Sequence, residues 1–161
     1  MKKFLTVFVL ALTLGFGLQA NAQTSKYKCM VQMKAYAGEK AYVVISLINP
    51  SGAYEKTLYM MGDDVKWYNG FKEWFKFFNK TKKVNARTGA SIGGGDRAMV
   101  NLDLENAHLN KGYKLRFESS VEAQNYHVSD VEIPLNAESL TGKIAGKGYI
   151  EYIRFSKVAQ P

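Results

Sequence analysis

The chain has 161 residues, of which 47% are hydrophobic and 22% charged, with a formal net charge of +8. This composition is globular and sufficient for one well-filled core, so it excludes a disordered tail protein and a collagen-like repeat. The single cysteine, Cys29, also excludes a small fold held together by disulfide bonds.

Residues 1–22 have the three regions of a secretory signal peptide. Two lysines follow the first methionine, residues 4–18 are mainly apolar, and Ala20-Asn21-Ala22 fits the small-residue cleavage pattern. The alternative is a membrane anchor, but the apolar stretch of about 15 residues is shorter than the roughly 20 that a membrane-spanning helix needs. We therefore predict cleavage before Gln23, export to the periplasm and one mature domain over residues 23–161, with no segment that spans the membrane.

Seven segments have the alternating, β-branched or aromatic character of strands. They are residues Tyr27–Ala35, Ala41–Asn49, Glu55–Met61, Arg97–Leu104, Tyr113–Val121, Tyr126–Leu135 and Gly148–Val158. The run from Ala41 is almost uniformly apolar and predicts a central strand, whereas Cys29 lies at an apolar position and predicts a buried, unreactive thiol. Together the segments predict a mostly β fold, a single antiparallel immunoglobulin-like β-sandwich with one short aromatic-rich helix.

Residues 67–80 break the strand pattern and predict that helix. Its apolar face consists of four aromatic residues at positions i, i+3, i+4 and i+7, the spacing of one side of a helix: Phe71, Trp74, Phe75 and Phe78. We favour a helix that plugs the open end of the sandwich with this face, because helical spacing explains the residues without a ligand. The alternative is a stacking site for a flavin, sugar or nucleobase, with Trp67 and Trp74 as ring contacts.

Residues 80–95 show no apolar periodicity and include Gly93-Gly94-Gly95, so they predict an irregular surface loop. Within it, Asn85-Ala86-Arg87-Thr88-Gly89-Ala90-Ser91 resembles the acceptor sequence of periplasmic FAD:protein FMN transferases. That sequence has Asp, two variable residues, Ser or Thr, Gly, Ala, and then the Thr or Ser whose hydroxyl receives FMN through its phosphate.

The resemblance implies covalent FMN on the Ser91 hydroxyl, with Gly89 and Ala90 leaving clearance for the transferase. Asn85 departs from the pattern because it replaces the acidic residue, and Ser91 replaces the usual threonine. The alternative interpretation is a loop in which Thr88 and Gly89 only make a turn.

Catalytic and metal-binding motifs are absent from the sequence. The two histidines, His108 and His127, lie outside any Gly-x-Ser-x-Gly or His-Glu-x-x-His pattern, and Cys29 has no partners at zinc-ligand spacing. We predict no enzyme activity and no metal. The lysines and arginines are spread evenly apart from a cluster over residues 76–87, which favours a solvated face over a nucleic-acid partner.

Several short motifs, taken in order, resemble a bacterial family of predicted periplasmic proteins that is catalogued as a domain of unknown function (two-two-seven-one). They are Tyr42-Val43-Val44-Ile45, Lys56-Thr57-Leu58-Tyr59, Trp67, Trp74, Thr88-Gly89-Ala90-Ser91, residues 112–118 and Gly148-Tyr149-Ile150. The resemblance implies an immunoglobulin-like sandwich that accompanies PepSY-type membrane redox proteins and FAD:protein FMN transferases. It implies an accessory role in extracytoplasmic electron transfer; the alternative is a non-catalytic binding module that docks an envelope or membrane partner.

Overall fold

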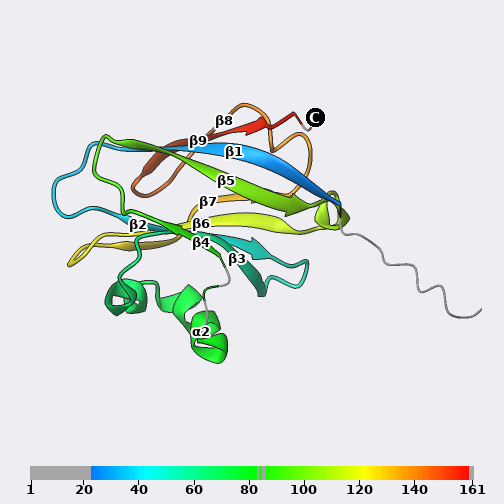
Figure 1. The fold of residues 1–161 in the computed structure, drawn as a ribbon. Helices are drawn as coiled ribbons and strands as arrows, with labels where there is room; N and C mark the ends of the chain where they lie inside the picture. Colours follow the sequence, from blue (N-terminus) through cyan, green and yellow to red (C-terminus); the bar gives the residue numbers. More distant parts are fainter. Residues whose placement is uncertain (1–22, 83, 85, 160–161) are drawn as a thin grey trace, which may run out of the picture.

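The structure is a computed structural model that describes residues 23–82, 84 and 86–159. The predicted signal peptide, residues 1–22, and Asn85 of the acceptor-like motif lie outside the described residues. In Figure 1 the described chain forms three layers, namely two sheets that face one another and a helical layer on the outside of one sheet.

The two sheets contain nine strands. The four-stranded sheet has the order β5-β1-β9-β8, and the five-stranded sheet has the order β4-β3-β2-β6-β7. The strands are β1 (Thr24–Met33), β2 (Tyr42–Ile48), β3 (Tyr54–Met61), β4 (Arg87–Gly89), β5 (Arg97–Glu105), β6 (Lys114–Ser120), β7 (Tyr126–Pro134), β8 (Lys143–Ala145) and β9 (Ile150–Lys157). All neighbours are antiparallel except β3 and β4. The mostly β, antiparallel sandwich with one short helix is therefore confirmed, and its immunoglobulin-like topology stays a prediction.

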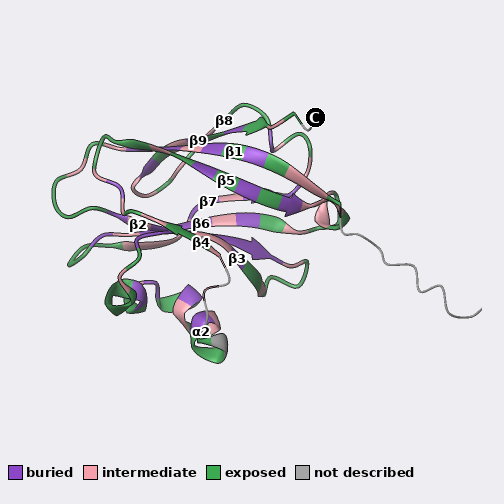
Figure 2. Cartoon of the chain, in the orientation of Figure 1, coloured by how far each residue is buried: buried purple, intermediate pink, exposed green. Residues whose placement is uncertain are grey.

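The main core lies between the sheets, where alternate residues of facing strands are buried (Figure 2). Phe155 of β9 contacts Tyr27 of its own sheet and Phe117 of the opposite sheet, both in edge-on ring contacts. Cys29 is completely buried in this core, which raises the pKa of its thiol and keeps it protonated. The predicted burial of Cys29 is confirmed.

The helical layer consists of a 3₁₀ helix, η1 (Val65–Gly70), and an α-helix, α2 (Lys72–Thr81). It covers the outer face of the five-stranded sheet, so the prediction that it plugs the open end of the sandwich is wrong (Figure 1). The reason is that β2 and the end of β3 have apolar residues on both faces. Val44 and Met60 point away from the sandwich core and are wholly buried under the helical layer, in a second core. Its other buried members are Tyr68, Phe71, Trp74 and Phe78.

The segment predicted as an irregular loop is partly a strand. β4 pairs in parallel with β3, and Ile92 forms an isolated bridge with Ala41. The glycine run has a packing role at Gly94. A Cβ atom on Gly94 would collide with the backbone of Tyr36, so glycine here permits a close approach between two segments.

Candidate cofactor pocket

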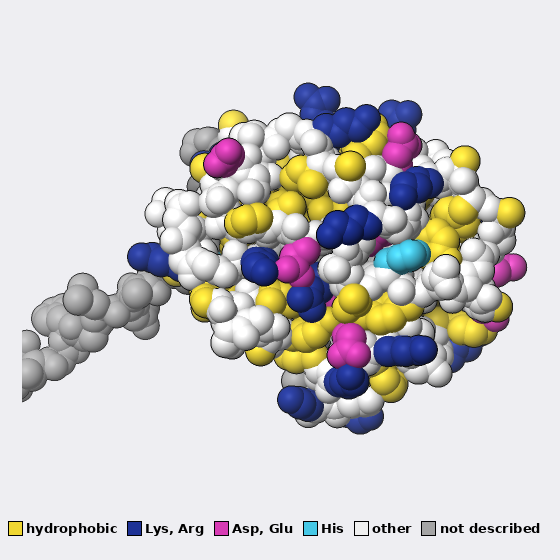
Figure 3. Space-filling model, turned by 180° about the vertical axis from the view of Figure 1, so that it is seen from behind, with side chains coloured by type: hydrophobic (Ala, Val, Ile, Leu, Met, Phe, Trp, Pro, Cys, Tyr) yellow, Lys and Arg dark blue, Asp and Glu magenta, His cyan; other side chains and the backbone are white. Residues whose placement is uncertain are grey.

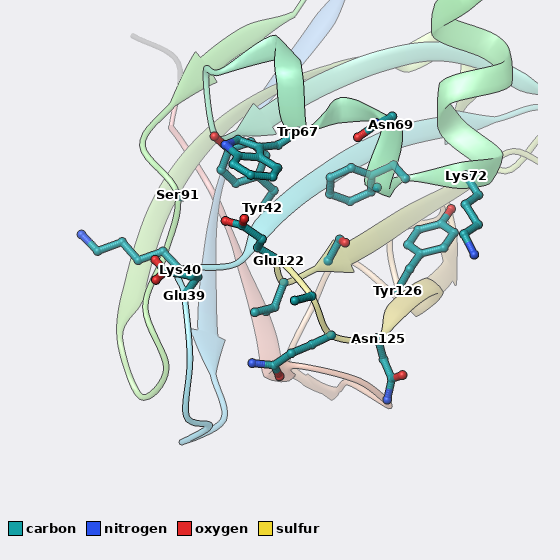
Figure 4. A pocket seen from close by; sticks show the side chains of 16 residues that line it. Glu39, Lys40, Tyr42, Trp67, Asn69, Lys72, Ser91, Glu122, Asn125 and Tyr126 are labelled. Atoms are coloured by element: carbon teal, nitrogen blue, oxygen red, sulfur yellow. The ribbon is translucent and has the colours of Figure 1, made fainter.

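A pocket of about 760 Å³ lies at one end of the five-stranded sheet. It is bounded by the β1–β2 loop, η1, the first residues of α2, the segment after β4 and the β6–β7 turn. Figure 4 shows Trp67 and Tyr42 at one end of the pocket and Tyr126 and Lys72 at the other. Its volume is in the range of clefts that hold small-molecule ligands.

Ser91 lines this pocket from a segment that is fixed on both sides. The carbonyl of Gly89 accepts a hydrogen bond from the amide of Gly62 at 2.6 Å, while Ile92 and Ala41 exchange two backbone hydrogen bonds of 2.9 and 2.7 Å. Ser91 is half-buried between these anchors and also lines a second, shallower pocket beside β5. Its position is therefore set by strand pairing rather than by an unattached loop.

The other acceptor-like residues lie along β4 and just after it. Thr88 and Ala90 are exposed, whereas Gly89 lies against Tyr59, whose hydroxyl oxygen would be 2.6 Å from an added Cβ atom. Gly89 therefore allows β4 to pack onto β3. The structure brings Ser91, but not Thr88 or Gly89, to the 760 Å³ pocket, and Asn85 lies outside the described residues.

The two predicted ring contacts occupy different environments. Trp67 on η1 is 38% exposed and lines the pocket together with Ser91. Trp74 on α2 is only 1% exposed, and its indole N–H donates a hydrogen bond to the Thr57 hydroxyl at 2.9 Å. The structure thus leaves Trp67 accessible to a ligand and places Trp74 inside the second core.

Three further aromatic residues line the pocket. They are Tyr42 at the start of β2, Phe71 between η1 and α2, and Tyr126 at the start of β7. From the sequence, Phe71 was predicted as helix core with a ring-stacking site as the alternative, whereas Tyr42 and Tyr126 were predicted only as strand residues. The signal that was missed is their position, because each lies at the end of an element rather than within it.

A buried carboxyl group, Glu118 of β6, lies behind the pocket. It is wholly buried and accepts hydrogen bonds from the hydroxyls of Tyr54, at 2.7 Å, and Tyr126. Burial raises the pKa of Glu118 to about 7, although both hydroxyls and Arg116 act in the opposite direction. Burial, reinforced by the charge of Glu118, also raises the pKa of both tyrosines, which therefore stay protonated.

Charged side chains border the pocket, and on the face drawn in Figure 3 they do not form one patch. Lys40 and Lys72 line the pocket along with Glu39 and Glu122. Figure 3 shows Lys and Arg side chains scattered over the face seen from behind, with Asp and Glu among them. Within the described residues, no three or more His, Cys, Asp or Glu side chains form a group that could hold a metal ion.

Comparison with known families gives a match over most of the chain. The model of a family described as predicted periplasmic protein (DUF2271) matches residues 24–152, most of the chain. The chain belongs to this family. The match confirms both the resemblance that the short motifs predicted and the predicted periplasmic location. The protein is therefore a DUF2271 domain of unknown function. No curated protein and no solved structure matches the chain. Among the described helices of this DUF2271 domain, none is long and apolar enough to cross a membrane.

Proposed function

We propose that this DUF2271 domain is a periplasmic flavin carrier, with FMN joined through its phosphate to the Ser91 hydroxyl. One observation carries the proposal. Ser91, the acceptor residue of the transferase-like motif, and Trp67, the exposed tryptophan, line the same pocket of about 760 Å³ (Figure 4). In the sequence these two residues are 24 positions apart, and only the fold places them together.

The residues of the pocket suit the parts of FMN. The isoalloxazine is a flat aromatic ring system, and Trp67, Tyr42 and Phe71 offer aromatic surface for it. The phosphate would carry negative charge at Ser91, and Lys40, which lines the same pocket, would supply a countercharge if its long side chain turned inward. The half-buried position of Ser91 holds the point of attachment in place, so the ring would have a limited range of positions.

The attachment step is a phosphoryl transfer without oxidation or reduction. The Ser91 hydroxyl oxygen attacks the phosphorus of the FMN half of FAD, forming a P–O bond while the pyrophosphate P–O bond breaks and AMP leaves. The hydroxyl proton passes to a base of the FAD:protein FMN transferase. When bound, FMN supplies one- and two-electron redox chemistry, and the chain holds and shields it. The proposed redox partner is a PepSY-type membrane protein.

The test is coexpression of the full chain with an FAD:protein FMN transferase, followed by intact-mass measurement. We expect one FMN per chain in the wild type and in Ser51→Ala, and none in Ser91→Ala. Ser91→Thr should keep the adduct because it restores the usual acceptor, and Asn85→Asp should raise the yield if the missing acid limits recognition. An unmodified wild type, with the transferase active on another substrate, would overturn the proposal.

A non-catalytic binding module is the second candidate function. The observation that favours it is the exposure of two large apolar side chains on η1, Val65 at 57% and Trp67 at 38%. Contiguous exposed apolar patches mark contact surfaces, and these two side chains would form the apolar part of such a surface on η1. A chain that stays free of flavin under the conditions above would support this candidate over the flavin carrier.

A further inference from the structure

The buried carboxyl of Glu118 has a balanced set of hydrogen-bond partners. As a carboxylate it has two oxygens, and the hydroxyls of Tyr54 and Tyr126 each donate to one of them. Arg116 lies on the same strand, and its guanidinium is 5.4 Å from the centre of the Tyr54 ring. This arrangement satisfies the charged form of Glu118 by hydrogen bonds, although the carboxylate is completely removed from water.

Both tyrosines also contact the helical layer. The Tyr126 ring meets Phe71 edge-on at 5.8 Å, and the Tyr54 ring stacks on Phe77 at 5.7 Å. The oxygen of the Tyr126 hydroxyl accepts a hydrogen bond of 3.3 Å from the amide of Glu73. This amide is in the first turn of α2, where backbone N–H groups have no partner within the helix. Tyr126 is thus a direct link between the Glu118 carboxyl and the start of α2.

The start of α2 is also a wall of the pocket. Phe71 and Lys72 line the pocket on one side, and the ring of Tyr126 lines it next to them (Figure 4). A continuous path of contacts therefore runs from the buried carboxyl through Tyr126 to the residues that would face a ligand. Movement of Tyr126 relative to Glu118 changes the shape of this wall.

The hydrogen bonds at the start of this path differ between the two protonation states of Glu118. A protonated carboxyl is neutral and brings a third O–H donor to the group, so both tyrosine hydrogen bonds lose their charge assistance and one of them must weaken, reverse or open. The titratable and charged groups that face Glu118 are Arg116 from β6, Tyr54 from β3, Tyr126 from β7 and Glu73 from α2, while β2 presents the apolar Val44 beside it. Because burial raises the pKa of Glu118 to about 7, both states are populated near neutral pH.

We propose that ionisation of Glu118 controls the pocket wall through Tyr126. The carboxylate holds Tyr126 and, through it, the first turn of α2, whereas the protonated carboxyl loosens this link. The pocket wall therefore tightens as the pH rises through neutrality. The inference rests on the proposed function for the identity of the ligand, since the regulated pocket is the proposed flavin pocket, but the coupling itself belongs to the chain without flavin.

The coupling is tested by NMR on the full, flavin-free mature chain labelled with ¹³C and ¹⁵N. Between pH 5 and 9 we expect the Glu118 carboxyl carbon and the Glu73 amide to show one common transition near pH 7. Glu118→Gln should lose the transition at the amide. Tyr126→Phe should leave the carboxyl transition and lose the amide transition. Glu122→Gln, which removes a carboxylate of the same pocket, should keep both.

The flavin-loaded chain provides the second measurement. Fluorescence anisotropy of attached FMN should rise between pH 5 and 8 in the wild type and stay flat in Glu118→Gln. A chain that takes up no FMN contradicts the proposed function and the flavin part of this inference, while the NMR result still decides the coupling. The inference is overturned if the Glu73 amide does not follow Glu118, if it still does so in Tyr126→Phe, or if anisotropy in the wild type is independent of pH.

Discussion

The two faces of the five-stranded sheet are built in different ways. The inner face packs against the second sheet and is mainly apolar, apart from the buried pair Ser119 and Asp130. The outer face is divided between an aromatic core under α2 and a polar group around Glu118, with the pocket beside them. The comparison shows that alternation along the strands is enough to predict which residues are buried on the inner face. The outer face depends on where the helical layer lies, and the candidate site is where that layer ends.

The largest expected effect comes from the aromatic half of the outer face. Trp74→Ala removes a 1% exposed indole that stacks on Phe78 at 5.2 Å and donates to Thr57. We expect the free energy of unfolding to fall by about 3–5 kcal/mol, as for other large-to-small core substitutions. Denaturant unfolding of the mature domain measures it. A loss below about 1 kcal/mol would contradict the second core, because that is the range of surface substitutions.

The polar half of the outer face predicts an unusual dependence of stability on pH. The pKa of Glu118 is about 7 in the folded chain and has an ordinary value of 4.5, so between these values the folded state keeps a proton that the unfolded state has released. The free energy of unfolding should therefore fall as pH rises from 4.5 to 7, by about 1.4 kcal/mol per pH unit. Over pH 5 to 8 the total is about 2.5 kcal/mol.

Unfolding of the wild type and Glu118→Gln at matched pH isolates this contribution from that of other titrating groups. We expect the difference in stability between the two proteins to change by about 2.5 kcal/mol from pH 5 to 8, with the wild type relatively weaker at pH 8. A difference independent of pH would show that Glu118 is charged throughout. The tighter link to α2 in the charged form and the lower overall stability are compatible, because burial of the charge weakens the whole fold.

Asp130 of β7 is a second buried acidic residue, and its hydrogen-bond partners differ from those of Glu118. It accepts hydrogen bonds from the Ser119 hydroxyl at 2.5 Å and from the amides of Gly148 and Ile150 at 2.6 and 2.9 Å, so it joins β7 of one sheet to the start of β9 in the other. Asp130→Asn replaces one acceptor oxygen with a donor group, which leaves a buried donor unpaired. We expect a loss of about 2 kcal/mol in thermal or denaturant unfolding.

The control for Asp130 is Asp103→Asn. Asp103 forms an exposed ion pair of 3.2 Å with Arg87, so its loss should change the stability by no more than about 0.5 kcal/mol. If both substitutions cost the same, the join between the sheets at Asp130 has no special role in stability.

The sequence is a good guide to the inner face and a poorer one to the outer face. All seven predicted strands are present because each has enough residues to show a pattern of alternation. β4 and β8, with three residues each, were missed because such short segments are defined by the strand beside them. The helix was predicted, but not its location, since Val44 and Met60 reveal a second buried face only once β2 and β3 are paired.

The same distinction applies to the candidate site. Ser91 and Trp67 were predicted from a motif and from an aromatic cluster, each without reference to the other. The pocket that contains both is assembled from segments near residues 40, 70, 91 and 123, and no local pattern links them. The polar group of Glu118, Tyr54 and Tyr126 joins three strands in the same way. Sequence periodicity therefore predicts which residues are buried, but not which polar residues meet.

The smallest expected effect on stability is at Trp67, the counterpart of Trp74. Its indole is 38% exposed on η1, and its one charged ring contact is the Lys66 ammonium at 5.1 Å from the ring centre. Trp67→Ala should therefore change the free energy of unfolding by no more than about 0.5 kcal/mol. In the chain carrying FMN on Ser91, the same substitution removes an aromatic surface from the pocket, and we expect the fluorescence of the attached flavin to increase. Trp74→Phe, which keeps a buried ring, should leave that fluorescence unchanged. A stability loss above about 2 kcal/mol at Trp67, with no change in flavin fluorescence, would place this tryptophan with the core residues and remove it from the candidate site.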